Sequence, residues 1–114
     1  MSVKKPELLA PAGSMESIYS AVRCGADAVY VGGAKFSARA NAVNFTDEEL
    51  SQAVEYCHLH GVKVYRAMNT VVFADEMKDF LSAAKSSSEM GVDGIIVQDL
   101  GAARLLREML PDMK

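Results

Sequence analysis

The sequence contains only two cysteines, and they form no C-x-x-C pair. Cys24 and Cys57 fall inside helical patterns without paired spacing, which predicts reduced, partly buried thiols in place of disulfides or a zinc site. Long hydrophobic runs are also missing. No apolar stretch approaches the roughly 20 residues of a membrane helix, and residues 1–6 lack the apolar region of a signal peptide. We therefore expect a cytoplasmic protein with no membrane partner.

Neither sign of charge is in large excess. The formal net charge is −3 and the sequence pI is near 5.3, so nothing global suggests attraction to a polyanion. Half of the residues are hydrophobic and 24% are charged, so the chain can bury a core. These values are typical of one folded domain or less.

The sequence motifs of common hydrolases are missing too. There is no H-E-x-x-H and no G-x-S-x-G, and neither cysteine has a partner histidine at a strand end. His58 and His60 are two residues apart at a helix end and do not face each other, so we predict no metal site. Any hydrolytic constellation is expected outside this chain.

A nine-residue pattern recurs along the chain. Residues 25–33 are echoed at residues 91–99 and, more weakly, at residues 61–69. In each copy a glycine follows a helical pattern and precedes a short β-branched run, as expected where a helix ends in a left-handed residue. The intervals between Gly25, Gly61 and Gly91 are 36 and 30 residues. Each interval has room for one strand and one helix, the βα unit.

Four strands and four helices follow from this reading. The expected strands are residues 7–10, 28–31, 62–68 and 94–97. Ser14 is the expected N-cap of the first helix, and Thr46 with Glu49 forms a capping box for the second. The third helix opens near Asp75, and the fourth runs from residue 100 until Pro111 stops it. Residues 32–45 form a long loop.

Four consecutive βα units predict an α/β fold with parallel strands. A doubly wound sheet usually has a Gly-rich phosphate loop after its first strand, whereas this chain has Pro-Ala-Gly-Ser at residues 11–14. A (β/α)8 barrel takes about 250 residues. We therefore predict that residues 1–114 are a single partial-barrel domain, the first half of a TIM-like (β/α)8 barrel and a fragment of a longer chain. Its open strand edges would pair with the remaining half or with a second copy.

Several motifs carry a resemblance. They are residues 6–14, 25–32, 39–45 and 97–101, which resemble the amino-terminal part of the collagenase-like peptidase family U32 along essentially the whole chain. The resemblance implies a TIM-like barrel whose first four units are present here. Family members are described either as proteases or collagenases, or as iron–sulfur enzymes that hydroxylate a base in ribosomal or transfer RNA or a quinone precursor.

The family's signature cysteines belong to a later part of the family's chain. The resemblance therefore implies no cofactor in this fragment, and an iron–sulfur cluster in the intact protein with its ligands outside this chain. It favours hydroxylation of an RNA base over hydrolysis of a protein substrate, with the fragment alone inactive. The alternative is a non-catalytic half-barrel module that self-associates through its open strand edges.

Active sites in such barrels lie at the carboxyl ends of the strands. Asp99 is the only acid directly at a strand end, so it is the predicted general base or hydrogen-bond anchor, with a helix N-cap as the alternative. The predicted substrate-binding residues are Ser14, Arg39, Asn41, Asn44, Asn69 and Gln98. Ser14 has an ordinary N-cap as its alternative, and Arg39 a salt bridge. Asp27 and Asp93 precede their strands, which predicts a stabilising role at the opposite end.

Overall fold

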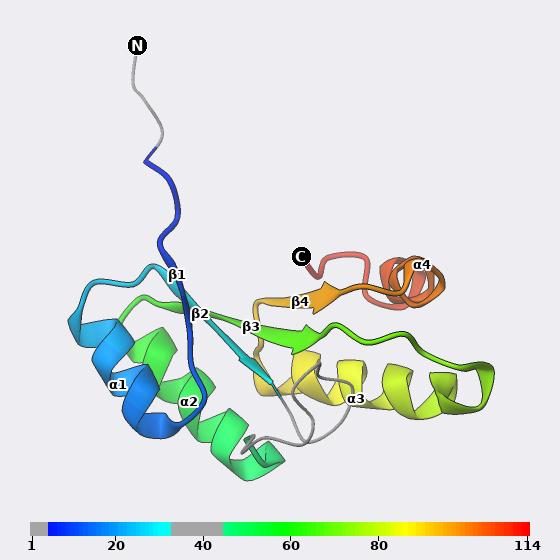
Figure 1. Cartoon of the computed structure of the whole chain (residues 1–114), viewed down its shortest axis with the longest axis horizontal. Coiled ribbons are helices and arrows are strands. Elements are labelled where there is room, and N and C mark those ends of the chain that lie inside the picture. Colours follow the sequence, from blue (N-terminus) through cyan, green and yellow to red (C-terminus); the bar gives the residue numbers. More distant parts are fainter. Residues whose placement is uncertain (1–4, 33–44) are drawn as a thin grey trace.

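The computed structural model describes residues 5–32 and 45–114. Four parallel strands form one sheet in the order β1-β2-β3-β4 (Figure 1). The strands are β1 (Leu9–Pro11), β2 (Ala28–Gly32), β3 (Lys63–Met68) and β4 (Gly94–Val97). Alternating with them are the helices α1 (Met15–Arg23), α2 (Asp47–Leu59), α3 (Met77–Met90) and α4 (Leu100–Met109), and the short 3-10 helix η1 (Ala74–Glu76) precedes α3. The predicted α/β fold with parallel strands is confirmed.

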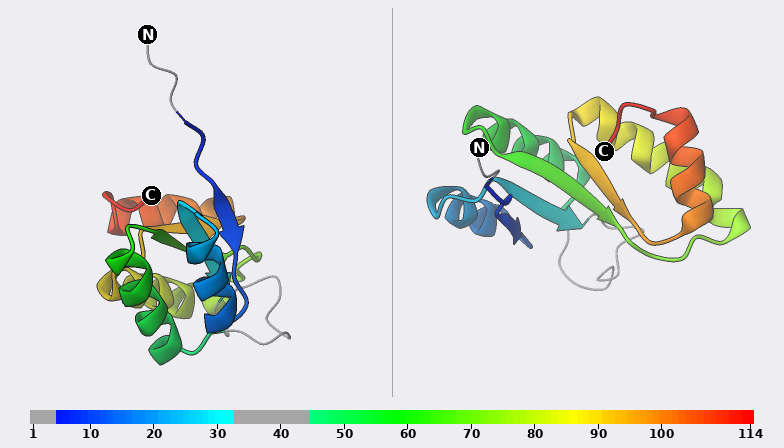
Figure 2. Two further views of the ribbon diagram at one scale, coloured as in Figure 1. Left: turned by 90° about the vertical axis from the view of Figure 1, so that its left-hand side faces the viewer. Right: turned by 90° about the horizontal axis from the view of Figure 1, so that it is seen from above.

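The helices all pack on one face of the sheet. Val64 and Met68 are two pleats apart on β3, so they point to the same side. Val64 joins the core cluster formed with α1 and α2, and Met68 joins the cluster formed with α3 and α4. Figure 2 shows the strands twisting from β2 to β4, with α4 beside β4. Helices on a single face are the arrangement of a barrel wall, not of a doubly wound sheet.

Local capping sets where three of the helices begin. Ser14 Oγ accepts a hydrogen bond from Ser17 N at 3.1 Å, and Asp99 Oδ1 accepts one from Ala102 N at 2.9 Å. At the start of α2, Thr46 Oγ1 accepts from Glu49 N at 3.2 Å while Glu49 Oε1 accepts from Thr46 N at 3.1 Å. The predicted N-cap at Ser14 and the predicted capping box are confirmed.

The glycines of the repeat end the helices as predicted. Gly25, Gly61 and Gly91 have φ angles of 92°, 71° and 95°, a region that side chains with a Cβ rarely adopt. The two aspartates of the repeat then tie neighbouring strands together. Asp27 Oδ2 accepts from Leu8 N and Asp93 Oδ2 accepts from Val64 N, each at 2.8 Å. Both contacts lie at the amino ends of the strands, where a stabilising role was expected.

Some local expectations were wrong. The first strand is Leu9–Pro11, not residues 7–10, because its pairing begins where Leu9 meets Ala28. Cys24 is exposed and not partly buried, because it follows the last turn of α1 at the surface; Cys57 is buried. The sequence also did not indicate that His58 Nε2 would lie 2.8 Å from Asp93 Oδ2. Helical periodicity alone does not show what a residue meets on another element.

Among the described residues, no helix is both long enough and apolar enough to span a membrane.

Candidate functional site

The carboxyl-terminal ends of the four parallel strands lie together at one end of the sheet, which we call the rim. Ser14 follows β1, Asn69 follows β3, and Gln98 and Asp99 follow β4. Parallel pairing therefore brings the ends that carry these residues to the same edge, as the sequence predicts. The other predicted binding residues, Arg39, Asn41 and Asn44, lie outside the described residues.

Asp99 joins two loops of the rim. Its Oδ2 accepts a hydrogen bond from Val72 N in the β3–η1 connection at 3.0 Å, while its Oδ1 caps α4 through Ala102 N. The Val72 N–H, followed by the Ala102 N–H, holds the pKa of the Asp99 carboxyl below its usual value. A carboxylate held in this way is a weak proton acceptor and a good hydrogen-bond anchor. Asp99 therefore caps α4, which is the role that the sequence offered as the alternative to a general base.

The remaining predicted binding residues differ in their exposure to solvent and in their hydrogen bonds. Ser14 is exposed, and its Oγ lies 3.0 Å from Ser17 Oγ in addition to capping α1. Gln98 is exposed and Asn69 is half-buried. The described structure therefore offers hydroxyl and amide groups at the rim.

Arg66 is a buried charge that the sequence analysis missed. It sits in the middle of β3, is only 4% exposed, and its Nη1 donates to Ser87 Oγ at 2.6 Å and to Ala83 O at 3.4 Å. Within the described part of the chain its Nε has no hydrogen-bond partner. Burial lowers the pKa of Arg66, and the nearby Asp47 opposes this shift. A charged residue in the middle of a strand whose inner residues are otherwise hydrophobic was the signal that could have found it.

Arg66 lies at an open cavity of about 430 Å³ between α2 and α3. Polar side chains dominate its lining, which consists of Phe45, Thr46, Asp47, Arg66, Asp79, Ser82, Ala83 and Ser86. The two carboxylates outnumber the single guanidinium, so this cavity does not present the positive field that attracts an anion. The clearest role for Arg66 is to fasten β3 to α3.

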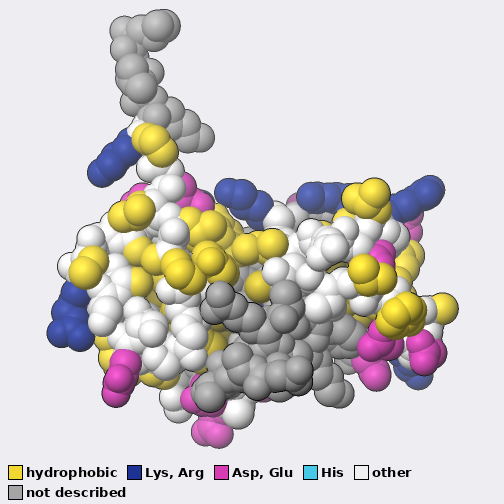
Figure 3. All heavy atoms as spheres, viewed as in Figure 1, with side chains coloured by type: hydrophobic (Ala, Val, Ile, Leu, Met, Phe, Trp, Pro, Cys, Tyr) yellow, Lys and Arg dark blue, Asp and Glu magenta, His cyan; other side chains and the backbone are white. Residues whose placement is uncertain are grey.

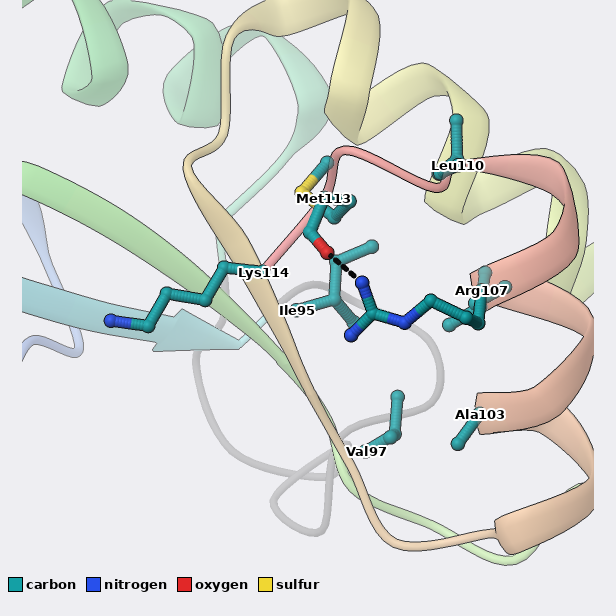
Figure 4. Close-up of a pocket in the computed structure, with 8 residues that line it drawn as sticks. Ile95, Val97, Ala103, Arg107, Leu110, Met113 and Lys114 are labelled. Atoms are coloured by element: carbon teal, nitrogen blue, oxygen red, sulfur yellow. Dashed lines mark hydrogen bonds between the residues drawn. The ribbon is translucent and has the colours of Figure 1, made fainter.

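A smaller hollow of about 80 Å³ lies at the open edge of β4. Ile95 and Val97 face Ala103, Leu106 and Leu110 of the α4 region across it, and Figure 4 shows Arg107 reaching toward Met113 beside it. Arg107 Nη1 donates to Met113 O at 3.0 Å. Ile95 N donates to Lys114 O at 2.9 Å, so the backbone of Lys114 already lies alongside β4. The hollow is apolar and suits packing more than catalysis.

The two cysteines do not fit an iron–sulfur cluster. Such clusters are held by several thiolates close together. Burial, and secondarily Asp93, raises the pKa of the Cys57 thiol to about 11, whereas Cys24 is exposed at the end of α1. In the described ranges, no group of three or more His, Cys, Asp or Glu side chains could hold a metal ion. A cluster could not take its ligands from these two residues.

Comparison with known proteins identifies the family. The sequence model described as Peptidase family U32 matches residues 13–114. The chain belongs to peptidase family U32. It is 40% identical to a tRNA hydroxylation protein of Bacillus subtilis over 97% of this chain and 26% of that protein. It is 41% identical to an uncharacterized protease of Methanocaldococcus jannaschii over 90% of this chain and 25% of that protein.

This U32 chain thus spans about a quarter of the length of the curated relatives it matches. A solved structure of a U32 peptidase superposes with a TM-score of 0.69 at 18% sequence identity, over 93% of this chain and 46% of that one. At this identity the likeness shows the fold alone. Four parallel strands with helices on one face, matching just under half of a U32 structure, make this chain a half barrel.

Proposed function

We propose that this U32 chain is the amino-terminal half of a (β/α)8 barrel, and that the intact protein hydroxylates a base of RNA. The observation that carries the proposal is the 40% identity, over 97% of this chain, to a protein named for tRNA hydroxylation. The relative named as a protease is similarly close, but two further relatives, at 38% and 36% identity, are named for hydroxylation of tRNA and for synthesis of 5-hydroxycytidine in 23S rRNA. Hydroxylation is therefore favoured over peptide hydrolysis.

The rim would form one side of the substrate site. Its proposed binding residues are Ser14, Arg39, Asn41, Asn44, Asn69 and Gln98. Hydroxyl and amide groups can read the edges of a base, and Arg39 would pair with a phosphate through two parallel hydrogen bonds. Asp99 would keep the β3–η1 connection in place beside them. The backbone N–H groups that lower the pKa of the Asp99 carboxyl favour the role of hydrogen-bond anchor over that of general base.

The rest of the barrel would have to add to β4. The hydrogen bond from Ile95 N to Lys114 O and the apolar hollow beside it support a further strand at that edge. An iron–sulfur cluster in the intact cytoplasmic enzyme would take its thiolates from outside this chain. A second candidate, self-association of half barrels, is favoured by the exposed apolar residues Leu9 on β1 and Ile96 on β4.

Genetic complementation tests the proposal. The intact gene that encodes this domain is expressed in Bacillus subtilis lacking its tRNA hydroxylation proteins, and tRNA nucleosides are then measured by mass spectrometry. We expect the hydroxylated nucleoside to return. Unmodified tRNA together with cleavage of denatured collagen by the purified intact protein would establish the peptidase instead. Light scattering on the 114-residue chain tests the second candidate, which a stable folded monomer would exclude.

A further inference from the structure

Three apolar side chains are exposed together at the rim. Val71, Phe73 and Leu100 are 57%, 67% and 86% exposed. The first two belong to the β3–η1 connection and Leu100 begins α4. The hydrogen bond from Val72 N to Asp99 Oδ2 joins these two segments, so the three side chains flank a single contact. We call Val71, Phe73 and Leu100 the rim patch.

The backbone that presents the patch is held in place. Val72, between its first two members, is buried in the core cluster that contains Phe80. Phe73 N donates to Glu76 Oε1 at 3.2 Å, and Glu76 N donates to Phe73 O at 2.9 Å. With the Val72 contact, three hydrogen bonds fix a turn that keeps hydrophobic surface in water. Exposed apolar surface presented in this way marks an interaction site.

The segment that carries Val71 and Phe73 is acidic. Asp75, Glu76 and Asp79 are balanced only by Lys78 within residues 69–79, which leaves three negative charges against one positive, or −2. Asp75 and Asp79 are exposed, and Figure 3 shows acidic side chains beside hydrophobic ones, with Lys and Arg side chains nearby, at the end of the molecule that carries this loop and α4. The acidic side chains favour a partner that carries positive charge.

We propose that the rim patch docks a protein segment in which apolar side chains are flanked by lysine or arginine. Phe73 would be the anchor, because exposed aromatic side chains contribute a large contact area at interfaces. The acidic residues around it would pair with the basic flanks and select the partner. This docking is tested on the 114-residue chain and the proposed RNA chemistry on the intact protein, so either proposal can fail without the other.

Peptide binding to the 114-residue chain tests the proposal. The probes are a short labelled peptide of leucines interspersed with lysines, the same peptide with glutamates for the lysines, and a single-stranded RNA oligonucleotide of similar length. We expect fluorescence anisotropy to show the lysine peptide binding at least about tenfold more tightly than the glutamate peptide, and less tightly in high salt. Equal affinity for both peptides, tighter binding of the RNA, or no binding of the lysine peptide would overturn the proposal.

Variants locate the binding. Phe73→Ala should weaken binding of the lysine peptide about fivefold or more, as truncation of an anchor does. Leu59→Ala is the matched control, because Leu59 is a 78% exposed apolar residue at the end of α2. The affinity of this variant for the lysine peptide should stay unchanged. Asp75→Lys should also weaken binding, and it leaves the apolar surface intact if Phe73→Ala folds poorly. Equal affinities of all three folded variants and the parent chain would place the peptide elsewhere and contradict the proposal.

Discussion

Asp27 and Asp93 make the same contact in two different βα units. The Oδ2 atom of each accepts a backbone N–H from the start of the preceding strand at 2.8 Å, from Leu8 and from Val64 respectively. The N–H of each aspartate also donates back to the carbonyl of the same residue. The weaker middle copy of the repeat has Lys63 at this place and makes only the backbone bond. Each of these two copies of the sequence repeat therefore links neighbouring strands through an aspartate, a contact that we call the clasp.

Replacing Asp93 should destabilise the chain more than replacing Asp27. Asp93→Ala leaves the amide of the fully buried Val64 without its side-chain partner and also removes the contact with His58, so we expect a loss of about 1–3 kcal/mol in the free energy of unfolding. Urea denaturation of both alanine variants measures the difference. His58→Ala should cost less than about 1 kcal/mol, because that pair is partly solvent-exposed. An Asp93→Ala variant as stable as the parent chain would show that the clasp is unimportant.

The Asp99 carboxylate should make the stability of the chain depend on pH in the acidic range. Hydrogen bonds from Val72 and Ala102 lower its pKa in the folded state, so its contribution is present above the unfolded pKa of about 3.9 and is lost as pH falls through the folded value. Asp99→Asn keeps a capping side chain but cannot titrate. The difference in urea midpoint between the parent and Asp99→Asn should therefore shrink as the pH is lowered from neutral. A difference that stays constant would refute the assignment.

Two phenylalanines separate core packing from surface exposure. Phe80 of α3 is fully buried in the core cluster that includes Ala102 and Leu106 of α4, so Phe80→Ala should cost about 3–5 kcal/mol of unfolding free energy. Phe73 is 67% exposed, and Phe73→Ala should stay within about 0.5 kcal/mol of the parent chain. Chemical denaturation compares the two. Similar losses in both variants would be inconsistent with the described packing.

The two cysteines should react with a thiol reagent at very different rates. Cys24 is exposed, whereas Cys57 is buried and has its pKa raised to about 11, which leaves little of the reactive thiolate. Ellman's reagent should label one thiol quickly in the native chain and the second only after unfolding. Cys24→Ser should abolish the fast phase. A fast phase that survives in this variant would mean that Cys57 is accessible.

The sequence predicted the features of the fold that depend on neighbouring residues. The N-cap at Ser14, the Thr46–Glu49 capping box and the helix-ending glycines are all local, and all are present. The start of β1 was misplaced because pairing with β2, and not local composition, decides it. The exposure of Cys24 and the contact between His58 and Asp93 depend on how elements meet, which periodicity does not reveal.

The sequence predicted where the candidate site lies, but not the contacts within it. The rule that parallel strands end together brought Ser14, Asn69 and Asp99 to one edge. It could not show that Val72 would occupy one oxygen of Asp99, because that bond joins loops 27 residues apart in the chain. Nor could it show that Arg66, on the helix-facing side of β3, would be buried against Ser87.

We propose that the rim of β1–β4 faces the RNA in the intact protein. The most direct test is the amount of hydroxylated tRNA nucleoside produced by intact-protein variants in the complementation assay. Asn69→Ala and Arg39→Ala should lower it at least about tenfold, the usual scale for removing a group that positions substrate. Lys63→Ala, an exposed residue at the amino end of β3, should leave it unchanged. Full activity in both rim variants, or an equal loss in Lys63→Ala, would contradict the account.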